Sequence, residues 1–99
     1  MNITKTKEGS ALTVALDGRL DAISAPQLDE MLKAEMETVT DLTLDLENLA
    51  HTSSAGLRVL LSAQKTMNKK GGMVIRNVSP EIMEIFDMVG FADLLNIEE

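Results

Sequence analysis

The hydroxyl side chains of Thr52, Ser53 and Ser54 are the part of this sequence best suited to carry chemistry. They follow a segment in which apolar and polar residues alternate, which predicts a strand over 42–47. After them the apolar residues recur at helical spacing, which predicts a helix that begins at Ser53 or Ser54. At such a junction, unpaired backbone N–H groups and the positive end of the helix dipole favour an anion. Two interpretations remain open, an ordinary helix cap or a serine that is phosphorylated.

Two residues within the predicted helix bear on the same junction. Gly56 has no side chain and is expected to let the helix approach the sheet closely. Arg58 follows one turn into the helix, where its guanidinium would pair with a phosphate or with a nearby acid. A phosphoryl group on Ser54 would add about −1.5 to −2 charges, and the helix N-terminus would tolerate them. The surface would then change while the fold survives, as a binding switch requires.

Other features of the sequence argue against catalysis. His51 is the only histidine and there is no cysteine, so neither a histidine pair nor a thiolate is available for a metal. The elbow of a serine hydrolase reads G-x-S-x-G, whereas residues 52–56 read TSSAG. The glycines at 71 and 72 do not make a phosphate-cradling loop. We therefore expect a protein that is not an enzyme and that needs no metal and no cofactor.

The elements that position this junction begin with a predicted hairpin. Residues 2–7 alternate weakly between apolar and polar, and residues 12–17 alternate strictly after a turn signal at Gly9. The pair Asp17 and Gly18 breaks the alternation and is expected to end the second strand.

A helix is predicted to begin at Ser24. Ser24 and Gln27 have the spacing of a capping box, and Ile23 and Leu28 have that of a hydrophobic staple. The apolar stripe of this helix consists of Leu28, Leu32, Met36 and Val39.

The second half of the chain repeats the alternation of strand and helix. The strand over 42–47 is apolar on one face only, which predicts that helices cover one side of the sheet. A polar loop to Ser53 or Ser54, a second helix and a short strand over 73–75 follow. Ser79 and Pro80 mark the start of a third helix whose buried stripe is expected to contain Ile82, Ile85, Phe86 and Val89. The predicted fold class is α/β, in the order β-β-α-β-α-β-α.

Composition limits the size and the partners of the protein. A chain of 99 residues with 44% hydrophobic residues is expected to fold as one domain, residues 1–99. A net charge of −7 disfavours direct binding to nucleic acid or to an anionic membrane. With no apolar leader and no cysteine, the sequence predicts a cytoplasmic protein, which we expect to be a monomer when alone.

Four motifs in order along the chain resemble those of the STAS domain, specifically of the stand-alone anti-sigma factor antagonists of bacteria. They are GRLDA at 18–22, DLENL at 45–49, TSSAGLRVLL at 52–61 and FDMVGF at 86–91. The resemblance covers essentially the whole chain and implies a single STAS-like domain with a mixed sheet and helices mainly on one side. It also implies a regulator of transcription that works by partner switching. In that family the unphosphorylated antagonist binds an anti-sigma factor, which is also a serine kinase, and thereby releases the sigma factor.

The resemblance also assigns roles to residues. Phosphorylation of the serine at the helix start ends the binding, and a PPM-type phosphatase restores it. That serine corresponds to Ser54, and Ser53 stands where many members have aspartate, so Ser53 is the alternative acceptor. Asp21 would lie in the loop that faces the phosphorylation site. The implied partner-binding residues are Asp21, Thr52, Ser53, Ser54, Ala55, Gly56 and Arg58.

Two alternatives remain from the sequence. Stand-alone STAS domains also resemble constitutive docking subunits of stress-signalling or lipid-transport complexes, in which the loop is not phosphorylated. Some STAS domains have been linked to nucleotide binding, which would make the chain a small-molecule binder. The sequence itself names no sigma factor, kinase or phosphatase.

Overall fold

The computed structural model describes residues 1–98, which form four strands and three helices in the order predicted from the sequence. The elements are β1 (Asn2–Glu8), β2 (Ala11–Leu20), α1 (Ala25–Glu35), β3 (Asp41–Thr52), α2 (Ser54–Met67), β4 (Gly72–Arg76) and α3 (Pro80–Met88). Among the described residues, no helix is long and apolar enough to cross a membrane.

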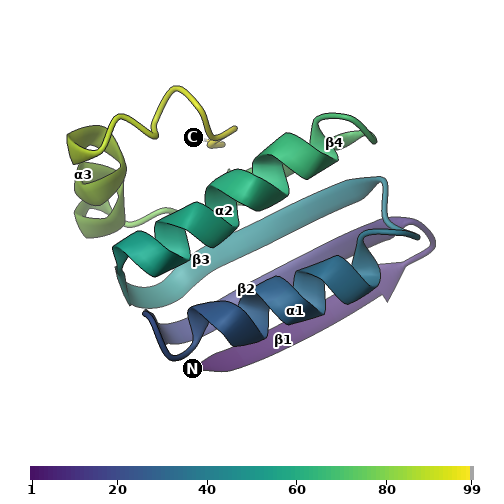
Figure 1. Ribbon diagram of the computed structural model, residues 1–99, viewed down its shortest axis with the longest axis horizontal. Coiled ribbons are helices and arrows are strands. Elements are labelled where there is room, and N and C mark those ends of the chain that lie inside the picture. The colour runs from purple at the N-terminus through teal and green to yellow at the C-terminus, as the bar shows by residue number, and fades with distance from the viewer. Residues whose placement is uncertain (99) are drawn as a thin grey trace.

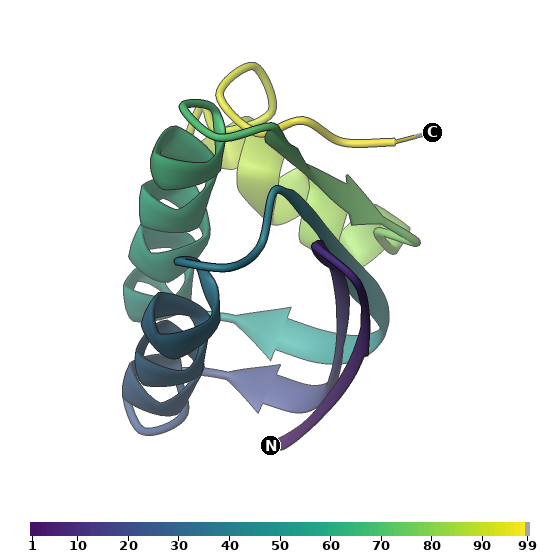
Figure 2. The ribbon, with the colours of Figure 1, turned by 90° about the vertical axis from the view of Figure 1, so that its right-hand side faces the viewer.

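The strands form one mixed sheet in the order β1-β2-β3-β4. β1 and β2 make the antiparallel hairpin, whereas β2 pairs with β3, and β3 with β4, in parallel. Helices α1 and α2 lie side by side over one face of the sheet (Figure 1), and the view at right angles shows both on the same side of the strands (Figure 2). The one-sided arrangement predicted from the alternation of β3 is confirmed.

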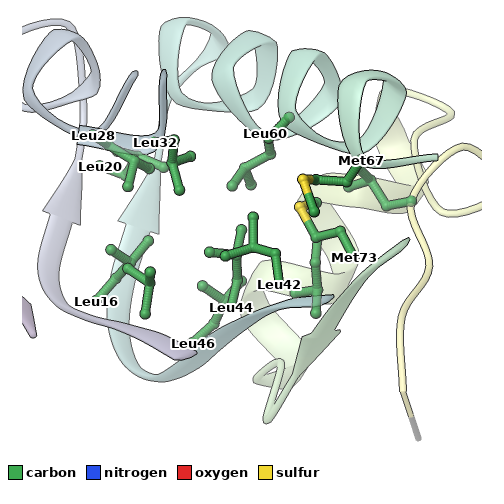
Figure 3. Close-up of a cluster of buried hydrophobic side chains, with 14 of the residues drawn as sticks. Leu16, Leu20, Leu28, Leu32, Leu42, Leu44, Leu46, Leu60, Met67 and Met73 are labelled. Atoms are coloured by element: carbon green, nitrogen blue, oxygen red, sulfur yellow. The ribbon is translucent and has the colours of Figure 1, made fainter. Parts of the chain in front are cut away.

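The core lies between this face of the sheet and the two helices (Figure 3). Alternate positions of β2 and β3 point toward the helices, as the period of two requires, and the neighbouring positions face solvent. Helices α1 and α2 close the core with residues at helical spacing. The fully buried members include Leu12, Leu16, Leu20, Leu28, Leu32, Leu44, Leu46, Leu60, Met67, Met73, Ile75 and Phe86.

Helix α3 starts as predicted but ends earlier. The Ser79 hydroxyl accepts a hydrogen bond from the Ile82 backbone N–H at 3.2 Å, which confirms the cap. Ile82 and Phe86 are buried, whereas Val89 is 48% exposed because the helix ends at Met88. The prediction that Val89 belongs to the buried stripe was wrong. The chain then turns back, and Ile97 makes a parallel bridge to Ile75 of β4.

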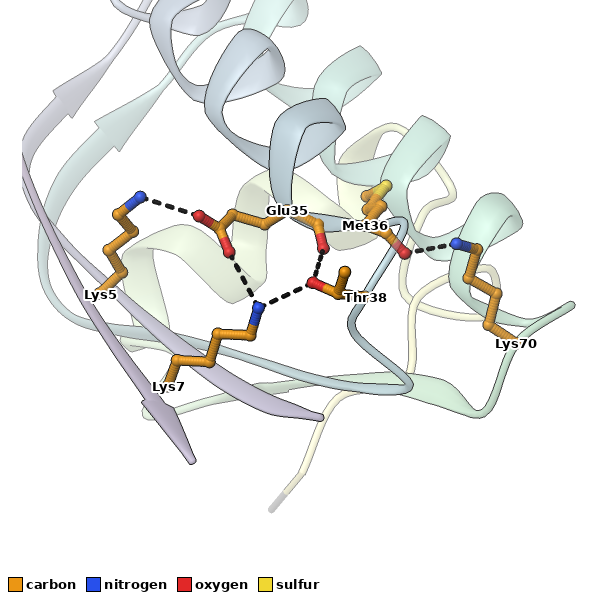
Figure 4. Close-up of polar contacts among 6 residues, drawn as sticks. All are labelled: Lys5, Lys7, Glu35, Met36, Thr38 and Lys70. Atoms are coloured by element: carbon orange, nitrogen blue, oxygen red, sulfur yellow. Dashed lines mark hydrogen bonds and ion pairs between the residues drawn. The ribbon is translucent and has the colours of Figure 1, made fainter. Parts of the chain in front are cut away.

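Lysines on the edge strand β1 point inward beneath α1 (Figure 4). Lys5 Nζ lies 3.0 Å from Glu35 Oε1, and Lys7 Nζ lies 3.6 Å from Glu35 Oε2 and 2.7 Å from Thr38 Oγ1. The hydrogen bond from Lys5, together with the charges of both lysines, holds the pKa of Glu35 below its ordinary value. Inward-pointing charges on an edge strand oppose its pairing with a further strand.

Candidate functional site

The strands that lead to the site run further than the sequence predicts. β2 continues past Asp17 and Gly18 to Leu20, and β3 continues to Thr52 instead of ending in a polar loop. The two strands stay paired in parallel up to Leu20 and Thr52, with register irregularities after Ala15 and after Gly18. Gly18 has φ 115°, so the break in alternation at this point is a bulge inside β2 and not its end. Pairing between the two strands thus outweighs the low intrinsic preference of these polar residues for the strand conformation.

Because β2 and β3 are parallel and end together, the loops that follow them lie at the same edge of the sheet. The Ser53 backbone N–H donates a 2.8 Å hydrogen bond to the carbonyl oxygen of Leu20. This bond joins the end of β2 to the start of α2. Asp21, the residue after Leu20, is therefore held next to the junction that contains Ser54.

The two candidate serines occupy different environments. Ser53 is the N-cap of α2 by position, but its hydroxyl makes no capping bond, and Ser53 Oγ is buried without a hydrogen-bond partner within the described chain. Ser54 is the first residue of the helix and is exposed. The helix start predicted at Ser53 or Ser54 is confirmed, and only Ser54 presents its side chain to solvent.

Gly56 holds the start of α2 against the sheet. A Cβ atom at Gly56 would lie 2.6 Å from Leu20 Cγ, 2.6 Å from Thr52 Oγ1 and 2.9 Å from Leu20 Cδ2, so no side chain fits here. Thr52 beside it is only 3% exposed. The expected close approach of helix and sheet is confirmed, and Thr52 and Gly56 lie beneath the surface on which Ser54 stands.

Asp21 organises a tight turn before α1. Its Oδ1 accepts hydrogen bonds from the backbone N–H groups of Ile23 and Ser24, each at 3.0 Å. The backbone bonds of Ser24 and Ile23 hold the pKa of the Asp21 carboxyl below its ordinary value of 3.8. The Asp21 carboxylate therefore has a structural role in this turn, in addition to any contact with a partner.

The turn replaces the capping box predicted at Ser24. The Ser24 hydroxyl donates to the Arg19 carbonyl at 2.7 Å and accepts from the Asp21 N–H at 2.9 Å, so it makes no cap bond to the helix. Ile23 is 82% exposed, and the predicted staple with Leu28 is therefore wrong. The position of the helix start is nevertheless as predicted, because Ser24 occupies the N-cap position and Ala25 is the first helical residue. An acid three residues before the serine was the signal in the sequence that favours this turn over a capping box.

The turn formed by Asp21 should make the stability of the protein depend on pH. Because the folded-state pKa of Asp21 is lowered, the carboxylate stabilises the fold fully above its ordinary pKa of 3.8 and loses this effect as the pH falls through the lower folded value. Asp21→Asn should therefore have a lower free energy of unfolding than wild type near pH 7, and the difference should shrink near pH 3. Urea denaturation at both pH values measures it. Asp17→Asn, which changes an exposed acid on β2, is the control, and an Asp21 difference that is independent of pH would contradict the prediction.

Arg58 completes the accessible part of the site. It lies one turn after Ser54 in α2, is exposed, and takes part in none of the ion pairs found among residues 1–98. Ala55, the residue after Ser54, is half-buried. Among the described residues, no group of three or more histidine or acidic side chains is placed to hold a metal. The accessible part of the site thus contains the exposed Ser54 hydroxyl at the first position of α2 and the Arg58 guanidinium one turn later.

Comparison with known proteins agrees with this geometry. The family model described as the STAS domain matches residues 2–99. The anti-sigma-B factor antagonist of Bacillus subtilis is 30% identical over 98 residues, which cover 98% of this chain and 90% of that protein. The solved structure of the anti-sigma factor antagonist SpoIIAA in its unphosphorylated form has a TM-score of 0.78 at 18% identity, covering 99% of this chain and 88% of that one. The Bacillus SpoIIAA structure in the phosphorylated form has a TM-score of 0.77 at 18% identity, with 99% and 92% covered. The chain belongs to the STAS domain family, among the anti-sigma factor antagonists.

Proposed function

We propose that this chain binds an anti-sigma factor serine kinase while Ser54 is unmodified, and that phosphorylation of Ser54 ends the complex. Binding would free a sigma factor for transcription, and a PPM-type phosphatase would return the chain to its binding form. The observation that carries the proposal is the exposed Ser54 hydroxyl at the first position of α2, in a chain similar along its length to an anti-sigma-B factor antagonist.

The environments of the two serines support Ser54 as the acceptor. A kinase must bring the γ-phosphate of ATP in line with the hydroxyl oxygen that attacks it. Ser53 Oγ is buried, and the Ser53 N–H is bonded to Leu20, so Ser53 is fixed at the end of the sheet. Phosphorylation of Ser53 would require the helix start to separate from β2, whereas Ser54 is accessible in the folded protein.

Electrostatics explains how a phosphoryl group would act as a switch. At the N-terminus of α2, a helix of 14 residues, the added negative charge meets the positive end of the helix dipole. Arg58, four residues later on the same helix, offers a second favourable charge. The folded state would therefore accept the phosphate, while a partner surface built for a neutral hydroxyl would have to desolvate it.

The remaining site residues have distinct roles in this proposal. Thr52 and Gly56 are buried and would set the position of the helix start, and Asp21 would order the neighbouring turn. Ser54, Ala55 and Arg58 would contact the partner. The chain itself catalyses nothing in this scheme, because the kinase transfers the phosphoryl group and the phosphatase removes it. We place the protein in the cytoplasm with these partners.

The proposal is tested by incubating the purified chain with Mg-ATP and each anti-sigma factor kinase encoded in the same genome. We expect the intact mass to rise by one phosphoryl group, and peptide mapping of residues 46–65 to place that group on Ser54. Ser54→Ala should remain unmodified, whereas the matched variant Ser53→Ala should still be phosphorylated.

Two other results would change the assignment. Phosphorylation that persists in Ser54→Ala and is lost in Ser53→Ala would move the switch to Ser53. A stable complex without any phosphorylation would overturn the switch and favour a constitutive docking subunit.

A further inference from the structure

Ile23 is a large apolar side chain exposed to solvent beside the proposed switch. It lies at the tip of the turn over residues 21–24 and is 82% exposed. A hollow of about 390 Å³ opens next to it, between Met1, Arg19 and the same turn. Neither the core nor the turn requires an isoleucine here, since the carboxylate of Asp21 bonds to the Ile23 backbone and not to its side chain.

The backbone around Ile23 is held in place by hydrogen bonds. Asp21 Oδ1 accepts from the Ile23 and Ser24 N–H groups, and the Ser24 hydroxyl donates to the Arg19 carbonyl. A side chain on a turn that is already ordered loses little conformational freedom on binding. Such a side chain gives up its contact with water and gains an apolar surface at small entropic cost, which is the usual property of an interface anchor.

The position of the turn connects Ile23 to the switch. Leu20 immediately precedes the turn, and its carbonyl accepts the hydrogen bond from Ser53, the residue before Ser54. The turn that carries Ile23 and the start of α2 that carries Ser54 therefore lie at the same edge of the sheet, where β2 and β3 end. One partner that covers Ser54 would reach this turn as well.

We propose that Ile23 is the apolar anchor of the docking surface and inserts into an apolar pocket of the anti-sigma factor kinase. This inference rests on the proposed function and adds a residue that fixes affinity independently of phosphorylation. Ser54 would decide whether binding occurs, and Ile23 would supply much of its strength. The hollow beside Ile23 would receive the rim of the partner's pocket.

A second exposed apolar residue provides a matched control. Met88 at the last position of α3 is 79% exposed, nearly as much as Ile23. In Figure 1, α2 lies between α3 on one side and α1, with the turn that precedes it, on the other. If any loss of exposed apolar surface weakened binding, substitutions at Ile23 and at Met88 would weaken it alike. If Ile23 is a local anchor, only the substitution at Ile23 would weaken binding.

The test measures binding of the unphosphorylated chain to each purified anti-sigma factor kinase of the same genome by titration calorimetry. We expect Ile23→Ser to raise the Kd about tenfold or more, Ile23→Val to bind nearly as wild type, and Met88→Ser to stay within about twofold. Circular dichroism melting of all four proteins should give similar Tm values, because the replaced side chains are exposed or conservatively changed.

The outcomes separate this inference from the proposed function. Equal binding of wild type and Ile23→Ser would overturn the anchor and leave the switch at Ser54 intact. Equal weakening by Met88→Ser would also overturn it, since the effect would not be local to the turn. If wild type bound none of the kinases, the proposed function would fail, and the anchor would fail with it.

Discussion

Replacing Ser54 by aspartate is expected to weaken binding to the anti-sigma factor kinase about a hundredfold while the fold stays intact. The carboxylate would stand at the exposed first position of α2, where the helix dipole stabilises a negative charge in the free protein. In the complex the same charge must be desolvated opposite a surface that fits a neutral hydroxyl, at a free-energy cost of several kcal/mol. Each 1.4 kcal/mol corresponds to about a tenfold change in Kd, so this effect should be large in calorimetric titration.

Two further variants distinguish position from charge. Ser54→Asn has nearly the shape of the aspartate without its charge and should weaken binding far less than Ser54→Asp. Ser62→Asp places the same charge on an exposed position further along α2 and should bind nearly as wild type. Binding of Ser54→Asp as tight as wild type would show that exclusion of charge at this residue is not the basis of the switch.

Much of the architecture could be predicted because one physical signal is strong in this sequence. Alternating leucines in β2 and β3 fix which face of the sheet is buried, and that pattern alone predicts helices on one side. The helix start at Ser54 and the close approach at Gly56 follow equally from local features. These features are local or periodic, so they are visible without any knowledge of long-range contacts.

The parts that could not be predicted depend on contacts between distant residues. The second half of β3 is polar, and it is a strand because β2 pairs with it up to Leu20. Ser53 looks like an ordinary capping serine, but its hydroxyl is buried beside the sheet and makes no cap bond. At Ile23 and Ser24 two local patterns compete, and the turn formed by Asp21 prevails over the staple and the capping box.

The largest effect on stability near the site is expected from Gly56→Ala. At an exposed position in a helix this change would stabilise the protein by roughly 1 kcal/mol, because alanine is the better helix former. Here the new Cβ would lie 2.6 Å from Leu20 Cγ and 2.6 Å from Thr52 Oγ1, and both neighbours belong to buried residues at the strand ends. Overpacking of this kind costs about 1–3 kcal/mol, which exceeds the gain in helix propensity. The substitution should therefore lower the free energy of unfolding instead of raising it. Urea denaturation measures the change.

The same substitution should disturb the switch, because the start of α2 must move to relieve the contact. We expect slower phosphorylation of Ser54 in Gly56→Ala, whereas Ser62→Ala, on an exposed position of the same helix, should alter neither stability nor phosphorylation appreciably.

A double-mutant cycle isolates the contact itself. Leu20→Ala removes two of the three atoms nearest to the added Cβ, so Gly56→Ala should destabilise the Leu20→Ala background less than it destabilises wild type. Additive losses in the two backgrounds would mean that Leu20 does not set the position of the helix start. In that case the link from the end of β2 to Ser54 would rest on the Ser53 to Leu20 hydrogen bond alone.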